Sequence, residues 1–217
     1  MNINKMTFVT NMLKLYLVTD RRYHPEMPLD QQVRTAIEGG VTSVQLREKD
    51  LSEADYIEIG KSVHAVTHSL GIPLIINDHP TVAKAIGAEG VHLGQDDGDV
   101  DAARKLLGAN AIIGVTAKSV EQAITAERCG ADYLGVGALF SSKSKTSAKR
   151  ISFELFDSIA QSVKIPIVGI GGINIDNLHY LAGHSMAGVA VVSALLDQPD
   201  ILGGTRRFYQ QLSEVLK

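Results

Sequence analysis

Three clusters of polar residues, each placed after a short apolar run, have the side chains needed to hold phosphate oxygens and a hard divalent ion. The clusters are Gln45-Leu46-Arg47-Glu48-Lys49, Asn77-Asp78 and Gln95-Asp96-Asp97. Residues 41–47 alternate with period two, so Gln45, Arg47 and Lys49 are expected on one face of a strand. Cationic side chains pair with phosphate oxygens, and carboxylates bind ions such as Mg²⁺. The clusters together predict a site for a magnesium-bound diphosphate.

Short apolar runs with the length of buried strands precede these clusters and recur along the chain, separated by helical patterns. The predicted strands are 13–19, 41–47, 73–77, 90–93, 111–116, 132–137, 166–169 and 188–193. No dinucleotide glycine fingerprint follows the first of them, so the alternation favours an α/β fold of the single (β/α)8 TIM barrel type over a doubly wound sheet. We expect one barrel domain over residues 1–217, with a short N-terminal extension, 1–12, before the first strand.

A barrel places the residues that follow its strands at one end, where the active site of this fold lies. All three polar clusters belong to that end. Gly169-Ile170-Gly171-Gly172 follows the seventh strand, and Val192-Ser193 ends the eighth. Loops at these two positions commonly grip phosphate through backbone N–H groups. The sequence therefore predicts two anion sites that face each other.

Composition excludes several classes of partner. The chain has 217 residues, enough to bury one sizeable core, and a formal net charge of -3 from 21 basic and 24 acidic residues. It has no basic footprint for nucleic acid and no apolar run long enough to span a bilayer. Its single cysteine, Cys129, can form no intrachain disulfide. We expect small-molecule partners, no nucleic acid or membrane, and a cytoplasmic location; the oligomeric state is left open.

The clusters, in this order and at similar intervals, resemble the thiamine-phosphate synthase (thiamine-phosphate pyrophosphorylase) family over nearly the whole chain. The matching segments are 45–49, 77–78, 91–97, 167–173 and 191–194. The resemblance implies a (β/α)8 barrel enzyme that uses Mg²⁺. It implies a transferase of thiamine biosynthesis, which joins 4-amino-2-methyl-5-hydroxymethylpyrimidine diphosphate to 4-methyl-5-(2-phosphoethyl)thiazole and releases diphosphate and thiamine phosphate.

The resemblance also implies roles for individual residues. Those that would grip the pyrimidine diphosphate are Gln45, Arg47, Lys49 and Asn77. The magnesium ligands would be Asp78 and Asp97, and the participation of Asp96 is left open. Thr116 matches a hydroxyl residue on the pyrimidine side. Residues that would hold the thiazole phosphate through backbone groups are Gly171 or Gly172, with Val192 and Ser193.

The loop after the sixth strand departs from the family pattern. The family commonly has Pro-Thr-x-Thr-Lys there, whereas this chain has Ser141-Ser142-Lys143-Ser144-Lys145. The resemblance makes Ser142, Ser144 and Lys145 substrate contacts, with a register one or two residues later left open. Lys145 would join Arg47 and Lys49 as the catalytic cations on the leaving diphosphate. We expect 141–150 to form a lid that keeps water from a reactive cation.

Three other functions remain open: a thiazole tautomerase of the same superfamily, another phosphate-handling barrel such as an isomerase of aromatic amino-acid synthesis, and a non-catalytic thiamine-phosphate binder. The tautomerase branch has a histidine shortly after the fifth strand, whereas this chain has Thr116-Ala117-Lys118-Ser119. A tautomerase or a binder has no need for the diphosphate cations and the metal aspartates together. That combination therefore favours the synthase.

Each cluster also has a purely structural interpretation. Asn77-Asp78 could cap a helix that begins near Pro80, and Asp96-Asp97 could form a turn. His92 lies inside a predicted strand among apolar neighbours, so we expect a buried, hydrogen-bonded core histidine. All the structural interpretations would have to hold at once at one end of one barrel, and this coincidence favours the functional interpretation of the clusters.

Overall fold

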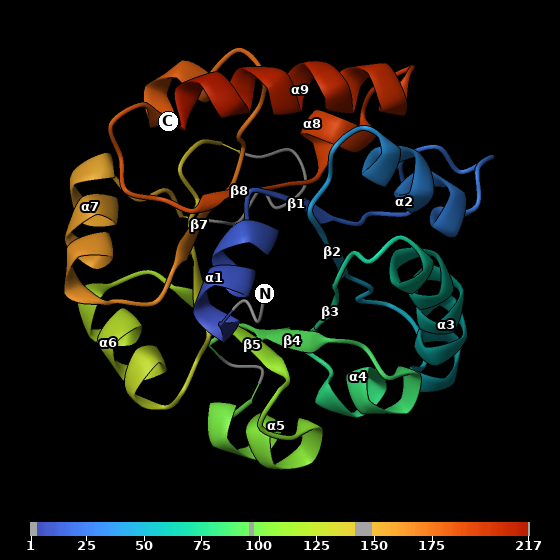
Figure 1. Cartoon of the computed structure of the whole chain (residues 1–217), viewed down its shortest axis with the longest axis horizontal. Coiled ribbons are helices and arrows are strands. Elements are labelled where there is room, and N and C mark those ends of the chain that lie inside the picture. The colour runs from blue at the N-terminus through green and yellow to red at the C-terminus, as the bar shows by residue number, and fades with distance from the viewer. Residues whose placement is uncertain (1–3, 96–97, 142–148, 217) are drawn as a thin grey trace.

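The computed structural model describes residues 4–95, 98–141 and 149–216. Within them, eight parallel strands close into a barrel in which each strand pairs with the next and β8 pairs with β1 (Figure 1). The strands are β1 (Leu15–Val18), β2 (Ser43–Leu46), β3 (Leu74–Asn77), β4 (Gly90–Leu93), β5 (Ile112–Ala117), β6 (Tyr133–Gly137), β7 (Ile167–Ile170) and β8 (Gly188–Val191). The predicted (β/α)8 TIM barrel is confirmed.

Helices surround this barrel, and one short helix lies over its centre in the view of Figure 1. The helices are α1 (Lys5–Met12), α2 (Leu29–Glu38), α3 (Glu53–Ser69), α4 (Pro80–Ile86), α5 (Val100–Leu107), α6 (Val120–Arg128), α7 (Phe153–Ser162), α8 (Ser193–Leu196) and α9 (Ile201–Val215), with a 3₁₀ helix, η1 (Leu178–Leu181), after β7. The central helix is α1, which occupies most of the predicted N-terminal extension. In the described part of the chain, no helix is both long and apolar enough to cross a membrane.

The strands are buried almost throughout because helices cover the outside of the barrel and side chains fill its inside. Two apolar clusters result. The larger lies between strands and helices, and the smaller lies inside the barrel around Tyr16, Ile75 and Tyr133. Val9 and Met12 of α1 belong to the inner cluster. Helix α1 therefore closes the N-terminal end of the barrel, which leaves the C-terminal end for a ligand.

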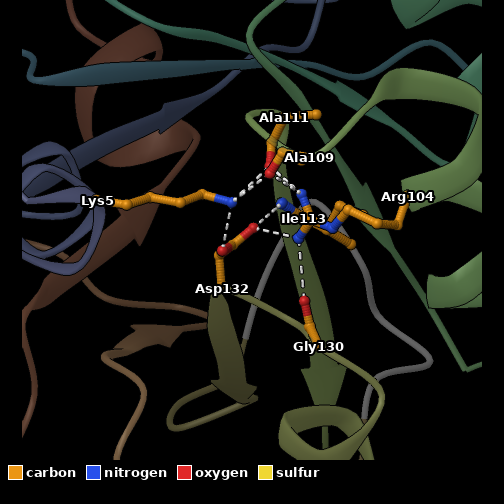
Figure 2. Close-up of polar contacts among 7 residues, drawn as sticks. All are labelled: Lys5, Arg104, Ala109, Ala111, Ile113, Gly130 and Asp132. Atoms are coloured by element: carbon orange, nitrogen blue, oxygen red, sulfur yellow. Dashed lines mark hydrogen bonds and ion pairs between the residues drawn. The ribbon is translucent and has the colours of Figure 1, made fainter.

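Asp132, the residue before β6, holds this closed end together (Figure 2). Its Oδ1 lies 2.7 Å from Lys5 Nζ of α1. Its Oδ2 accepts hydrogen bonds from Arg104 of α5 at 2.7 Å and from the backbone N–H of Ile113 at 2.8 Å. Lys5 also donates to the carbonyl of Ala111 at 2.9 Å. One carboxylate thus links α1, α5, β5 and β6.

We expect Asp132→Ala to lower the free energy of unfolding by about 1–3 kcal/mol, because the substitution leaves the Ile113 N–H without its acceptor and removes the charge partner of Arg104 and Lys5. The measurement is chemical denaturation. Lys5→Met is the control: its side chain is 39% exposed, so this variant should lose less than about 1 kcal/mol. Equal losses in the two variants would contradict the central role of the carboxylate.

Candidate active site

A cavity of about 190 Å³ lies at the C-terminal end of the barrel, and every strand contributes to its lining. Its apolar walls include Val18, Ile170, Ile173 and Val191. Polar residues of the strand ends complete it. A flat, partly apolar ligand that carries anionic groups matches this combination of surfaces.

The floor of the cavity is a chain of hydrogen bonds that crosses the barrel from β2 to β5. Gln45 donates through Nε2 to the hydroxyl of Tyr16 at 2.9 Å, and that hydroxyl lies 2.9 Å from the hydroxyl of Tyr133. The Tyr133 hydroxyl lies 3.0 Å from His92 Nδ1, and His92 Nε2 lies 3.0 Å from Thr116 Oγ1. His92 is therefore the buried, hydrogen-bonded histidine expected from its position. Gln45 and Thr116, at the two ends, also line the cavity.

The two tyrosines of this hydrogen-bonded network are neutral groups. Tyr16 and Tyr133 are fully buried, and burial raises the pKa of each hydroxyl well above its ordinary value. Each hydroxyl therefore keeps its proton and can both donate and accept. The hydrogen bond to Tyr16 therefore holds the Gln45 side chain in place at the floor of the cavity before any ligand arrives.

The two predicted cations after β2, Arg47 and Lys49, differ in their placement. Arg47 lines the cavity, and its backbone N–H donates to Thr19 Oγ1 at 3.1 Å. Lys49 lies exposed in a bend outside the lining, because β2 ends at Leu46 and the period-two alternation ends with it. Glu48, which lies between them in the sequence, accepts a hydrogen bond from Arg21 Nε at 2.9 Å. Burial raises the pKa of Glu48, and Arg21 partly offsets that rise.

Asn77 and Asp78 form a pair beside the cavity. Asn77 lines it, and its Nδ2 donates to Asp78 Oδ2 at 2.5 Å. Asp78 has a left-handed backbone with φ 63°, and its N–H donates to the carbonyl of His92 at 2.9 Å. The N-cap of α4 is His79, not either member of the pair. A strained backbone that aims a half-buried carboxylate is typical of a functional position.

Several predicted site residues lie outside the described part of the chain: Asp96, Asp97, Ser142, Ser144 and Lys145. Their roles, and the lid, stay predictions. Gln95, just before the first of these gaps, donates through Nε2 to the carbonyl of Thr116. This bond holds the end of the described β4 loop against the end of β5.

The remaining predicted residues lie together on the side of β7 and β8. They line the cavity and are Gly171, Gly172, Val192 and Ser193. Both glycines have positive φ, 99° and 66°, which other residues rarely adopt. A Cβ on Gly172 would lie 2.2 Å from the carbonyl oxygen of Ser141. In the strand order, β7 and β8 are opposite β3 and β4, so the glycine backbone faces the Asn77 side across the cavity.

Sequence reasoning missed part of the lining. Tyr16, Thr19 and Asp20 all belong to it, and Lys118 lies exposed at its edge. Asp20 is buried and accepts two hydrogen bonds from the Arg22 side chain at 2.9 and 2.5 Å. The bond from Arg22 is the main reason why the pKa of Asp20 lies below its ordinary value, so the carboxylate is ionised. Thr19 ends the first predicted strand and Asp20 follows it, so the expectation that residues at the C-terminal ends of strands form the site could have found them.

The closed barrel and this cavity define an enzyme of the (β/α)8 class with a small-molecule site. The sequence matches the thiamine monophosphate synthase family over residues 15–195. The thiamine-phosphate synthase of Ruminiclostridium cellulolyticum is 46% identical over 196 residues, which are 90% of this chain and 93% of the relative. That of Clostridium acetobutylicum is 48% identical over 188 residues, 87% of this chain and 89% of the relative.

A solved structure agrees with these relatives. Thiamine phosphate pyrophosphorylase from Pyrococcus furiosus has a TM-score of 0.88 and 38% identity, covering 96% of this chain and all of that one. The chain therefore belongs to the thiamine monophosphate synthase family. The family and the enzymatic class predicted from the sequence are confirmed.

We expect Gly172→Ala to destabilise the protein more than Gly183→Ala. Both glycines have positive φ, so each variant should lose about 1–2 kcal/mol through the left-handed backbone. A Cβ at Gly183 meets nothing within 4 Å, whereas one at Gly172 meets backbone atoms, so the loop there must also move. The free energies of unfolding can be compared by denaturant titration. Equal losses would show that the close approach at Gly172 has no energetic consequence.

Proposed function

We propose that this chain joins 4-amino-2-methyl-5-hydroxymethylpyrimidine diphosphate to 4-methyl-5-(2-phosphoethyl)thiazole, forming thiamine phosphate and diphosphate. The observation that carries the proposal is the pairing of two different anion-binding surfaces in one cavity. Arg47 and Asn77 lie on one side, and the glycine backbone after β7 lies on the other. Two substrates that each carry phosphate, and that must meet between these surfaces, match this arrangement.

The pyrimidine side supports the departure of diphosphate. Diphosphate leaves readily only when its charge is neutralised, and cationic side chains do this best in a partly dry site. In our proposal Arg47 binds the diphosphate, and Lys49 and Lys145 contribute further positive charge. Gln45 and Thr116 are held in place by hydrogen bonds to Tyr16 and His92, and they bind the pyrimidine ring. Val18 and Ile173 exclude water from the faces of the ring.

The thiazole side supports the second step. Backbone groups at Gly171 or Gly172, with Val192 and Ser193, bind the thiazole phosphate, and all four residues line the cavity. The pyrimidine cation that remains after diphosphate departs shares its charge with the ring amino group, and the thiazole nitrogen attacks it. No side-chain nucleophile is needed. Positioning and charge carry the catalysis.

The Asp78 carboxylate beside the cavity fits a hard divalent ion. Asp78 is half-buried and oriented by Asn77, and an oxygen donor set with substrate oxygens and water suits Mg²⁺. Asp78 and Asp97 would hold the ion. When bound, Mg²⁺ supplies positive charge to the diphosphate oxygens. The small-molecule substrates and the absence of a basic footprint also support a cytoplasmic enzyme that acts without nucleic acid or membrane.

A thiazole tautomerase is the alternative with the most similar substrates. Its branch has a histidine after the fifth strand, where this chain has Lys118. Lys118 is exposed, with its backbone N–H bonded to Gln122 Oε1 at 2.8 Å. This chain therefore lacks, after β5, the histidine that shuttles the proton in that branch. The synthase therefore accounts for more of the cavity than the tautomerase does.

The direct test is to mix the purified protein with both substrates and Mg²⁺ and to follow thiamine phosphate by mass spectrometry. We expect product that requires both substrates and disappears when the metal is chelated. Incubation with the thiazole carboxylate tautomer alone is the control, and we expect no aromatisation above the uncatalysed rate. A folded protein that makes no thiamine phosphate, or that aromatises the tautomer rapidly, would refute the proposal.

We expect Asp78→Ala and Asp97→Ala each to lower turnover by about a hundredfold or more, as the loss of a preorganised electrostatic group does elsewhere. Each should also raise the Mg²⁺ concentration needed for half-maximal rate. Asp101→Ala is the matched control, because Asp101 is an exposed carboxylate in the first turn of α5. Full activity and unchanged metal dependence in Asp97→Ala would move the assignment to Asp96.

A further inference from the structure

Three potential metal ligands converge at a place that the proposed reaction does not use. His64 and His68 are four residues apart on α3, so they share one face of the helix, and their ring centroids are 5.5 Å apart. Glu89 comes directly before β4. Its Oε1 lies 3.2 Å from His64 Nε2 and 3.9 Å from His68 Nδ1. One donor atom from each residue lies within 4.8 Å of the other two.

Glu89 is held in place by the ends of two strands. Its Oε2 accepts a hydrogen bond from the N–H of Leu74, the first residue of β3, at 2.8 Å. Its carbonyl accepts from the N–H of Ile112, the first residue of β5, at 2.9 Å. The backbone and one carboxylate oxygen are therefore fixed, and the other oxygen is the one that both imidazoles approach. Such outer bonds orient metal-binding carboxylates in known sites.

These contacts place the cluster at the N-terminal end of the barrel. Leu74, Glu89 and Ile112 all lie where strands begin, whereas the cavity is lined by residues where strands end. The cluster is therefore separate from the residues proposed to bind substrates and Mg²⁺.

We propose that His64, His68 and Glu89 form a binding site for a transition-metal ion of the Zn²⁺ class. Two imidazoles and one carboxylate are ligands that suit Zn²⁺ better than Mg²⁺ or Ca²⁺. With metal–ligand bonds of about 2.0–2.2 Å, donors around a tetrahedral ion are roughly 3.4 Å apart. The distances from Glu89 Oε1 to His64 Nε2 and His68 Nδ1, 3.2 and 3.9 Å, lie on either side of that value. The His68 side chain is 74% exposed, so it can rotate to shorten its distance to Glu89.

A simple histidine–carboxylate pair explains less of this geometry. It accounts for His64, whose Nε2 is within hydrogen-bond distance of Glu89. It leaves out His68, whose Nδ1 lies 3.9 Å from the same oxygen, beyond the length of a hydrogen bond. A shared ion accounts for both rings. Bound there, Zn²⁺ connects α3 to the start of β4, and water completes its coordination.

The test is calorimetric titration of the full chain with Zn²⁺ in the presence of millimolar Mg²⁺, which occupies hard-oxygen sites first. We expect one Zn²⁺ per chain, and binding weaker by roughly tenfold or more in His68→Ala and in Glu89→Gln. The amide oxygen of the Glu89→Gln variant can still accept from Leu74, so this variant should fold. His179→Ala, which removes an exposed histidine elsewhere, is the control and should bind as the original chain does.

Two further readouts do not depend on enzymatic activity. Co²⁺ in place of Zn²⁺ should give visible ligand-field absorption that His68→Ala abolishes. Zn²⁺ should raise the unfolding temperature of the original chain and of His179→Ala, but not that of His68→Ala, because only a ligand that binds the folded state stabilises it. Absence of saturable Zn²⁺ binding, or equal binding in His68→Ala and the original chain, would overturn the proposal.

Discussion

The hydrogen bond between the hydroxyls of Tyr16 and Tyr133 separates the barrel interior into two parts. Below it the interior is apolar and closed by α1, and above it polar side chains join apolar walls to line the cavity. The bond requires both rings to lie inside a narrow barrel, where space is scarce. Gly114 of β5 provides that space, because a Cβ there would lie 2.0 Å from the Tyr133 ring. A buried, satisfied network of this kind fixes its members in one arrangement.

The two ends of this network, Gln45 and Thr116, are fixed in place at the ligand site. Gln45 and Thr116 belong to strands on different sides of the cavity, yet both are bonded to the same pair of tyrosines, Thr116 through His92. Their polar groups therefore keep their separation without a ligand. Nearby, Asp20 is bonded to Arg22 and Glu48 to Arg21. The charge of the cavity-lining Arg47 also favours the ionised form of both carboxylates, after the larger effect of their own arginine partners.

Residues at the C-terminal ends of parallel strands are expected to meet around one site, and this expectation, the strand-end rule, explains both the success and the limits of the sequence analysis. It placed Gln45, Asn77 and Gly172 correctly around the cavity, since parallel strands end together and the eight apolar runs were visible. It placed Lys49 on the same face as Gln45, but β2 stops before Lys49 and the alternation no longer applies. Tyr16 has apolar neighbours in a buried strand, so nothing in the sequence distinguishes it from a core residue. Its role depends on a partner 117 positions away.

The two ends of the barrel use carboxylates for different purposes. Glu89 and Asp132 each come just before a strand and accept from a backbone N–H near the start of the preceding strand, Leu74 and Ile113. Parallel strands leave such N–H groups without strand partners at their first residues, so a carboxylate there stabilises the barrel. Each then attracts cationic or basic side chains from neighbouring helices. At the C-terminal end of the barrel the unpaired backbone groups of the strands are carbonyls, which need no carboxylate acceptor. Carboxylates at that end can therefore bind a ligand. This separation lets the histidine cluster on α3 acquire a metal without altering the cavity at the opposite end.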